Sequence, residues 1–233
     1  MTTNVAWVRR LVVIGSVGAL VALGAWPSAG VAATNLGETS TTGTNCLAGV
    51  TPYSHVQQAT GSGASYTAPT DGVITSWSHE AQAGAGQMLK LKIYRATANP
   101  DEFTVVGQST AESLDESALN TFDTQISVKA GDLLGMTRTA AVNVRCLFGT
   151  LDAGDIARDD PGADDANGVT SLFFSGKFVE TRVNVAAVLE PDADGDGLGD
   201  ETQDADDDND GTNDTTDNCL GLANADQADA DGD

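Results

Sequence analysis

Residues 191–233 cannot build an apolar core. They contain sixteen Asp and Glu side chains and no Lys or Arg, and uncompensated like charges repel one another. Such a segment stays a solvated coil unless something offsets both its charge and its ordering entropy. A divalent cation held by several carboxylates would offset both.

The acidic residues form two copies of one pattern, D-x-D-x-D-G-x-x-D, which begin fourteen residues apart. Calcium loops carry oxygen ligands at positions 1, 3 and 5, turn sharply at a glycine in position 6, offer a backbone carbonyl at position 7 and close the shell with positions 9 and 12. The predicted calcium ligands are Asp192, Asp194, Asp196 and Asp200 in the first loop, and Asp206, Asp208, Asp210, Asp214 and Asp217 in the second.

Position 12 distinguishes the two loops. It is Asp217 in the second loop but Gln203 in the first. We therefore expect the first loop to bind calcium less tightly, unless the neighbouring Asp204 substitutes for the missing carboxylate.

Two alternatives to this interpretation are weaker. A purely disordered acidic tail would not place glycine at position 6 twice, although disorder is the expected state of the tail without metal. EF-hands and dockerins share the D-x-D-x-D-G core but place it between helices, and no apolar residues at helical spacing flank these loops.

The second loop runs into a longer motif. It reads Asp217-Asn218-Cys219-Leu-Gly-Leu-Ala-Asn224-Ala-Asp226-Gln227-Ala-Asp229-Ala-Asp231-Gly232-Asp233. This resembles the thrombospondin type 3 repeat, D-N-C-P-x-x-x-N-x-D-Q-x-D-x-D-G-D, with Leu220 where proline is usual. The resemblance covers the acidic segment only. It implies calcium-dependent folding of an irregular string around shared ions, with cysteines pairing between repeats.

The third loop stops at its fifth position. Asp229, Asp231 and Asp233 therefore form an incomplete calcium site, and Cys219 has no later repeat to pair with. The chain as given is expected to end in mid-repeat.

Residues 1–33 are predicted to be a secretory signal peptide. Arg9 and Arg10 precede an apolar stretch over 11–26, and small residues end at Ala33. A membrane anchor, the alternative, needs about twenty apolar residues. Secretion or display at the cell surface is therefore expected.

The charge of the chain limits its partners. Its formal net charge is −23, and removal of the two signal-peptide arginines makes it more negative. Such a chain repels nucleic acid and anionic membranes. Calcium ions, extracellular glycans and surface proteins are the expected partners, with no span of the membrane in the mature chain.

Residues 34–190 are expected to form an all-β, antiparallel, jelly-roll-like β-sandwich. Short runs alternate with Gly, Pro and Asp turns. In residues 88–94, Leu89, Leu91 and Ile93 alternate with Lys90, Lys92 and Tyr94, which indicates one buried and one wet face. The segment 126–132 resembles those of bacterial secreted sandwich domains in a generic way. Residues 152–168 are predicted to be a solvated loop, with a further ion site as the alternative.

Cysteine usage adds one constraint. Of Cys46, Cys146 and Cys219, two would normally pair in an exported protein. Cys46 and Cys146 both lie in the sandwich region, so these two are predicted to form a disulfide.

No catalytic motif is present, and we expect no enzyme. His55 and His79 lack the partners of a zinc or serine hydrolase motif. Trp77, Tyr94 and Tyr53 could form an aromatic platform for sugars, or belong to the core. The favoured hypothesis is a calcium-binding structural or adhesive protein with a calcium-stiffened stalk. The alternatives are a carbohydrate-binding module on a calcium linker and, last, a secreted hydrolase.

Overall fold

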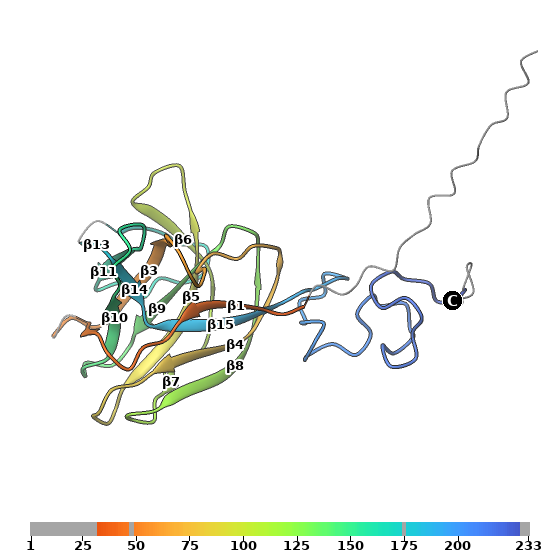
Figure 1. Cartoon of the computed structure of the whole chain (residues 1–233), viewed down its shortest axis with the longest axis horizontal. Coiled ribbons are helices and arrows are strands. Elements are labelled where there is room, and N and C mark those ends of the chain that lie inside the picture. Colours follow the sequence, from red (N-terminus) through yellow and green to blue (C-terminus); the bar gives the residue numbers. More distant parts are fainter. Residues whose placement is uncertain (1–31, 47–48, 174–175, 229–233) are drawn as a thin grey trace, which may run out of the picture.

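A computed structural model describes residues 32–46, 49–173 and 176–228. Within these ranges the chain forms fifteen strands and no helix (Figure 1), which confirms the predicted all-β class. No helix in the described part of the chain is long and apolar enough to cross a membrane. The predicted signal peptide lies outside the described residues, apart from Ala32 and Ala33.

Eight strands form four nested antiparallel pairs, each enclosing the next along the sequence. The pairs are β1 (Thr34–Glu38) with β15 (Val185–Glu190), β3 (Tyr53–Ala59) with β9 (Leu133–Arg138), β4 (Gly72–Glu80) with β8 (Leu119–Val128), and β5 (Met88–Ala96) with β6 (Glu102–Gln108). The result is the folded-over double Greek key of a jelly roll. The predicted sandwich is confirmed.

These strands are divided between two main sheets. One sheet has the order β1-β15-β4-β8. The other has the order β12-β6-β5-β9-β3-β11-β13, where β11 is Ile156–Pro161, β12 is Thr170–Leu172 and β13 is Gly176–Val179, and β7 (Glu112–Ser113) pairs with β5. A third, small sheet, β14-β10-β2, lies beside them. Its strands are β14 (Thr181–Val183), β10 (Arg145–Gly149) and β2 (Thr44–Asn45).

The main core lies between the facing sheets. Leu89, Leu91 and Ile93 of β5 are at most 1% exposed, and the indole of Trp77 on β4 packs 4.9 Å from the ring of Phe122 on β8. Burying each such side chain contributes about 1.5–3 kcal/mol. The period-two pattern of the sequence therefore identified this face correctly.

The opposite face of β5 is not wet, contrary to the sequence prediction. Lys92 and Tyr94 are 0% and 1% exposed. Tyr94 packs edge-on against Phe173, which also contacts Phe103, in a second apolar cluster on the outer face. Alternation reports that one face is buried, but it cannot reveal a distant segment that covers the other.

The chain between β10 and β14 supplies this cover. The segment predicted as a solvated loop contains β11 (Ile156–Pro161), which pairs with both β3 and β13 (Gly176–Val179). It leads to β12 (Thr170–Leu172), which pairs with β6. A run of Asp and Pro has low strand propensity, but pairing with strands on both sides overrides that preference.

Two acidic side chains of this segment pair with cationic side chains of the sandwich. Asp155 is 0% exposed and accepts a 2.9 Å hydrogen bond from Nε of Arg182. Asp164 lies 2.9 Å from Nζ of the buried Lys92. The acidic run is therefore folded and paired, and the predicted solvated loop is wrong.

Cys46 and Cys146 form a disulfide, as predicted. It joins the residue after β2 to β10, with the two Cα atoms 5.2 Å apart across a sequence separation of 100 residues. Closing a loop of that length stabilises the fold by up to about 4.7 kcal/mol in the chain-entropy model. Among the described residues, Cys219 is the free cysteine.

Candidate metal centre

The acidic segment leaves one end of the sandwich after β15 as a series of irregular turns (Figure 1). In the first loop, one carboxylate oxygen each from Asp192, Asp194 and Asp196 lies within 4.8 Å of the other two. The second loop brings Asp206, Asp208 and Asp210 together in the same way. We call these sets the first and second triads.

Backbone amides fold both loops around their carboxylates in the same manner. The amide at position 6 donates to the carboxylate at position 1, at 3.3 Å for Gly197 to Asp192 and 3.0 Å for Gly211 to Asp206. The amide at position 5 likewise donates to position 3 in each loop, at 2.9 and 3.1 Å. These bonds draw positions 1, 3 and 5 toward a common centre.

The remaining hydrogen bonds repeat as well. The amide at position 7 donates to position 5 at 2.7 Å in both loops. The amide at position 2 donates to position 9, at 3.1 Å to Asp200 in the first loop and 2.9 Å to Asp214 in the second. Asp200 and Asp214 thus hold the loops closed, but neither belongs to a triad.

Both loops require left-handed backbone at two positions. At position 6, Gly197 and Gly211 have φ of 89° and 94°. At position 4, Gly195 and Asn209 have φ of 79° and 54°. Glycine and asparagine tolerate this region at low cost. The sequence analysis recognised position 6 and missed position 4, where a Gly or Asn in each loop was the available signal.

Position 12 also differs between the loops. Gln203 of the first loop donates from Nε2 to the carbonyl oxygen of Thr124 on β8, at 2.8 Å. Asp217 of the second loop accepts hydrogen bonds at 2.8 Å from the amide of Cys219 and at 2.9 Å from Nε2 of Gln227. Neither residue belongs to a triad. Asp229, Asp231 and Asp233 lie outside the described residues.

Several carboxylate oxygens near the second loop are buried without a hydrogen-bond donor. They are Oδ2 of Asp204, Oδ1 of Asp206, Oδ1 of Asp207 and Oδ2 of Asp208, none of which has a hydrogen-bond partner in the described part of the chain. A buried anionic oxygen without a partner is costly. A cation among the carboxylates of the second triad would give Asp206 and Asp208 a partner.

Several carboxyl groups of the acidic segment have a raised pKa, as expected for negative charges held together without a counter-charge. Burial, then the charges of Asp214, Asp200 and Asp204, raise the pKa of Asp207 to about 7. Burial also raises the pKa of Asp208 and of Asp200. The segment has no Lys or Arg to balance these charges, so the donor set fits a hard, oxygen-preferring divalent ion.

Glu190 anchors the first loop to the sandwich. This side chain at the end of β15 is 2% exposed. Its Oε1 accepts from the hydroxyls of Thr75 on β4 and Thr202, at 2.7 and 2.8 Å. Its Oε2 accepts from the amides of Thr202 and Glu201, at 3.0 and 3.2 Å.

Further contacts hold the same loop against the sheet. Nε2 of Gln125 on β8 donates to the carbonyl of Gly197 at 2.8 Å. A Cβ atom at Gly199 would lie 2.6 Å from Cγ2 of Thr75, so only glycine allows this close approach. The first loop is therefore packed on the sandwich rather than hanging freely from it.

The motif after the second loop has a structural role that sequence reasoning left unassigned. Nε2 of Gln227 lies 3.2 Å from Oδ2 of Asp210, which also accepts a 3.0 Å bond from the amide of Asn224. Asn218 donates to the carbonyl of Gln227 at 3.1 Å. The amide side chain of Asn209 in the second loop donates to Asp194, which links that loop to the first triad.

Comparisons with models of known protein families, with curated proteins and with solved structures found no match to this chain.

The aromatic side chains considered as a sugar platform are buried. Tyr53, Trp77 and Tyr94 are 4%, 1% and 1% exposed, so they belong to the packed interior of the sandwich. His79 is also buried, and its Nδ1 donates to the carbonyl oxygen of Asn184 at 2.7 Å. These side chains serve packing rather than an exposed binding surface.

Proposed function

We propose that the acidic segment binds calcium and that the whole chain is a secreted or cell-surface structural or adhesive protein, in which calcium stiffens a stalk. The observation that carries the proposal is the repeated loop. Two copies of one sequence pattern adopt the same set of amide-to-carboxylate hydrogen bonds and each gathers three carboxylates within 4.8 Å.

The residues of the chain would act in three ways. The triads would bind the ion directly, with the carbonyls at position 7 as further oxygen ligands. Asp200 and Asp214 would hold each loop closed. Calcium would supply positive charge to a segment that has no cationic side chain, which removes the repulsion that otherwise keeps it expanded.

The resemblance to thrombospondin type 3 repeats supports the same proposal. In this chain, Asn218, Asn224 and Gln227 stand at the positions of that motif and hydrogen-bond one another and Asp210. These contacts connect the second triad to the segment that follows. Extracellular calcium modules work with dissociation constants of about 0.1–1 mM, so the loops would be filled outside cells.

The proposal is tested by calorimetry on residues 34–233. The unsubstituted protein should bind calcium, and the variant with Asp206, Asp208 and Asp210 all replaced by Asn should lose the second site. The matched control is Asp226→Asn, which removes one charge from the same segment outside both triads. Equal losses in the control and the triad variant would reduce the tail to a non-specific polyanion.

A further inference from the structure

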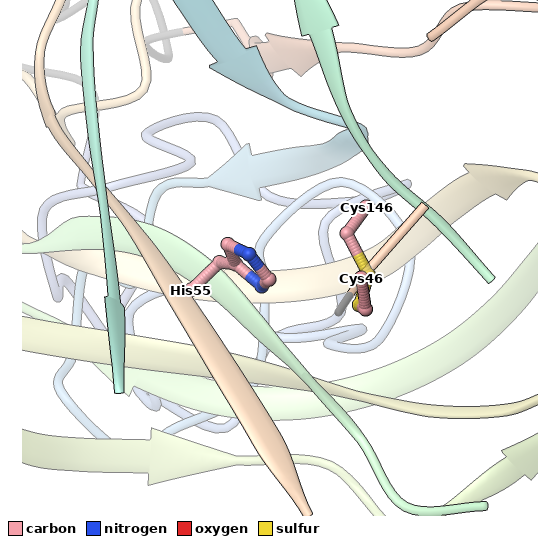
Figure 2. Close-up of side chains that lie close together, drawn as sticks. All are labelled: Cys46, His55 and Cys146. Carbon is pink, nitrogen blue, oxygen red and sulfur yellow. A yellow bond between two sulfur atoms is a disulfide. The ribbon is translucent and has the colours of Figure 1, made fainter. Parts of the chain in front are cut away.

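A second group of side chains whose types can bind a metal ion lies inside the sandwich, away from the acidic loops. Cys46 follows β2, Cys146 is on β10 and His55 is on β3. One ligand atom from each of these three residues lies within 4.8 Å of the other two. Figure 2 shows the imidazole of His55 beside the disulfide that joins the cysteines.

The imidazole is held in place but one of its nitrogens is unsatisfied. His55 is 1% exposed, and its Nδ1 has no hydrogen-bond partner among the described residues. An unpaired buried polar atom costs about 1–3 kcal/mol. The ring packs edge-on against Tyr53, with centroids 4.8 Å apart. One of the two ring nitrogens lies within 4.8 Å of both sulfur atoms. A buried imidazole with an unsatisfied nitrogen is a poor choice for packing alone.

We propose that reduction of the Cys46–Cys146 disulfide turns this group into a Cys2His site for a thiophilic divalent cation such as Zn²⁺. A two-electron reductant, a thiol or a phosphine, breaks the S–S bond. Each sulfur gains one electron and one proton, and the reductant is oxidised to a disulfide or, with water as the oxygen source, to a phosphine oxide. The two thiols then release their protons as the sulfur–metal bonds form.

The charge and the size of the group suit such an ion. Two thiolates balance the two charges of Zn²⁺, so the buried site would carry no net charge, which low-dielectric surroundings favour. Zn–S bonds of about 2.3 Å and Zn–N bonds of about 2.0 Å place tetrahedral ligand atoms about 3.4–3.8 Å apart. The present separations fall under 4.8 Å, which suits such a ligand set once the S–S bond is broken.

The site would also differ in kind from the acidic loops. Thiolate and imidazole ligands select zinc-like ions, whereas the carboxylates of the tail select hard ions such as calcium. His55 lies opposite the buried Met136 in the β3–β9 pairing and opposite the buried Asp159 in the β3–β11 pairing. The surroundings therefore offer a soft thioether and one carboxylate, whose charge acts on the imidazole together with that of Arg138. One chain would then hold two classes of metal in separate places.

Cobalt provides the probe for this site. A protein of residues 34–233 is first saturated with calcium, which occupies the acidic loops, and is then reduced with a phosphine. The phosphine is removed under anaerobic conditions, and the reduced protein is titrated with Co²⁺. We expect one cobalt per chain, with the sulfur-to-metal charge-transfer and intense visible bands of tetrahedral thiolate coordination, displaced by Zn²⁺. His55→Gln should weaken binding at least tenfold. His79→Gln, which removes the other buried histidine, should leave it unchanged.

Each outcome decides the proposal. The absence of a sulfur–cobalt band in the reduced protein would overturn it, as would equal cobalt affinity in His55→Gln and the unsubstituted chain. If reduction alone loosens the sandwich, near-ultraviolet circular dichroism supplies the readout. Zn²⁺ should then restore the signal in the unsubstituted protein but not in His55→Gln, and a failure of restoration in both would count against the site.

Discussion

Individual residues decide how well each loop can hold an ion. Asp210 is the most connected carboxylate of the second triad, since it accepts bonds from the amides of Thr212 and Asn224 and lies within reach of Gln227. Asp196, its counterpart in the first triad, accepts a bond from Leu198. Replacing the residue at position 5 therefore removes more hydrogen bonds in the second loop than in the first.

We therefore predict that Asp210→Ala weakens calcium binding more than Asp196→Ala. A hydrogen bond to a charged group contributes about 1.5–3 kcal/mol, so the difference should be about tenfold or more. Calorimetry on the two variants measures it, with Asp226→Ala as the control for lost charge. Equal losses at Asp210 and Asp196 would contradict the expected order of the loops.

A second residue-scale prediction concerns pH. Burial lowers the pKa of His79 from 6.5 to about 4, with the nearby charge of Arg145 acting in the same direction and the hydrogen bond to Asn184 opposing it. The unfolded state therefore binds a proton near pH 6.5, while the folded state resists protonation until about pH 4. Stability should fall as the pH drops through this window and should be unaffected by His79 above it.

The comparison of pH 7 with pH 5 checks this. His79 alone should reduce the free energy of unfolding by about 2 kcal/mol over that interval. Denaturant titrations followed by the fluorescence of Trp77 measure the change at constant calcium. His79→Gln should show a shallower dependence than the unsubstituted protein, and an identical slope in both would remove His79 as the cause.

At the scale of elements, the junction between β15 and the first loop couples the two parts of the molecule. Glu190 accepts four hydrogen bonds across this junction, and β4 and β8 contribute Thr75, Thr124 and Gln125 to it. Without such contacts, the sandwich would unfold independently of calcium. Through these contacts, calcium bound in the first loop would stabilise the sheet.

We predict that calcium raises the melting temperature of the sandwich and that Glu190→Gln reduces this increase. Glutamine replaces one accepting oxygen by an amide donor that faces other donors. The first loop is then held less firmly against the sheet. Ligand linkage then transfers less binding energy to the fold. Differential scanning calorimetry with calcium and with chelator measures both shifts. Glu102→Gln, at the start of β6, serves as the control and should retain the full increase.

At the scale of the whole molecule, we expect the acidic segment beyond the first loop to change its dimensions with calcium. Sixteen carboxylates without a counter-charge in the chain favour an expanded coil, whereas ions in both triads would fix the turns in a compact string. The contact between Asn209 and Asp194 would then join the two loops.

Small-angle scattering of residues 34–233 should therefore give a smaller and less variable maximum dimension in millimolar calcium than in chelator. The difference should persist in moderate salt, where screening has already relaxed charge repulsion. The variant with Asn at Asp206, Asp208 and Asp210 should respond less. A dimension that follows ionic strength but ignores calcium would leave the tail as a solubilising segment, and the stalk hypothesis would lose its physical basis.

The sequence by itself determined the features that depend on local pattern. The alternation in β5 identified its inner face, and the three cysteines led to the Cys46–Cys146 pair. The spacing of Asp and Gly identified both acidic loops. Each of these signals is carried by a short run of residues or by simple chemistry, because strand periodicity and loop turns are set by neighbours in the chain.

Only the tertiary structure decided the rest. The outer face of β5 is dry because Phe173, about eighty residues later, packs on Tyr94. An acidic run becomes β11 because strands on both sides supply its hydrogen bonds. Glu190 and Gln125 became loop anchors, and His55 a neighbour of the disulfide, through approaches between segments far apart in sequence. Such contacts follow from the packing of the sheets, and no local propensity encodes them.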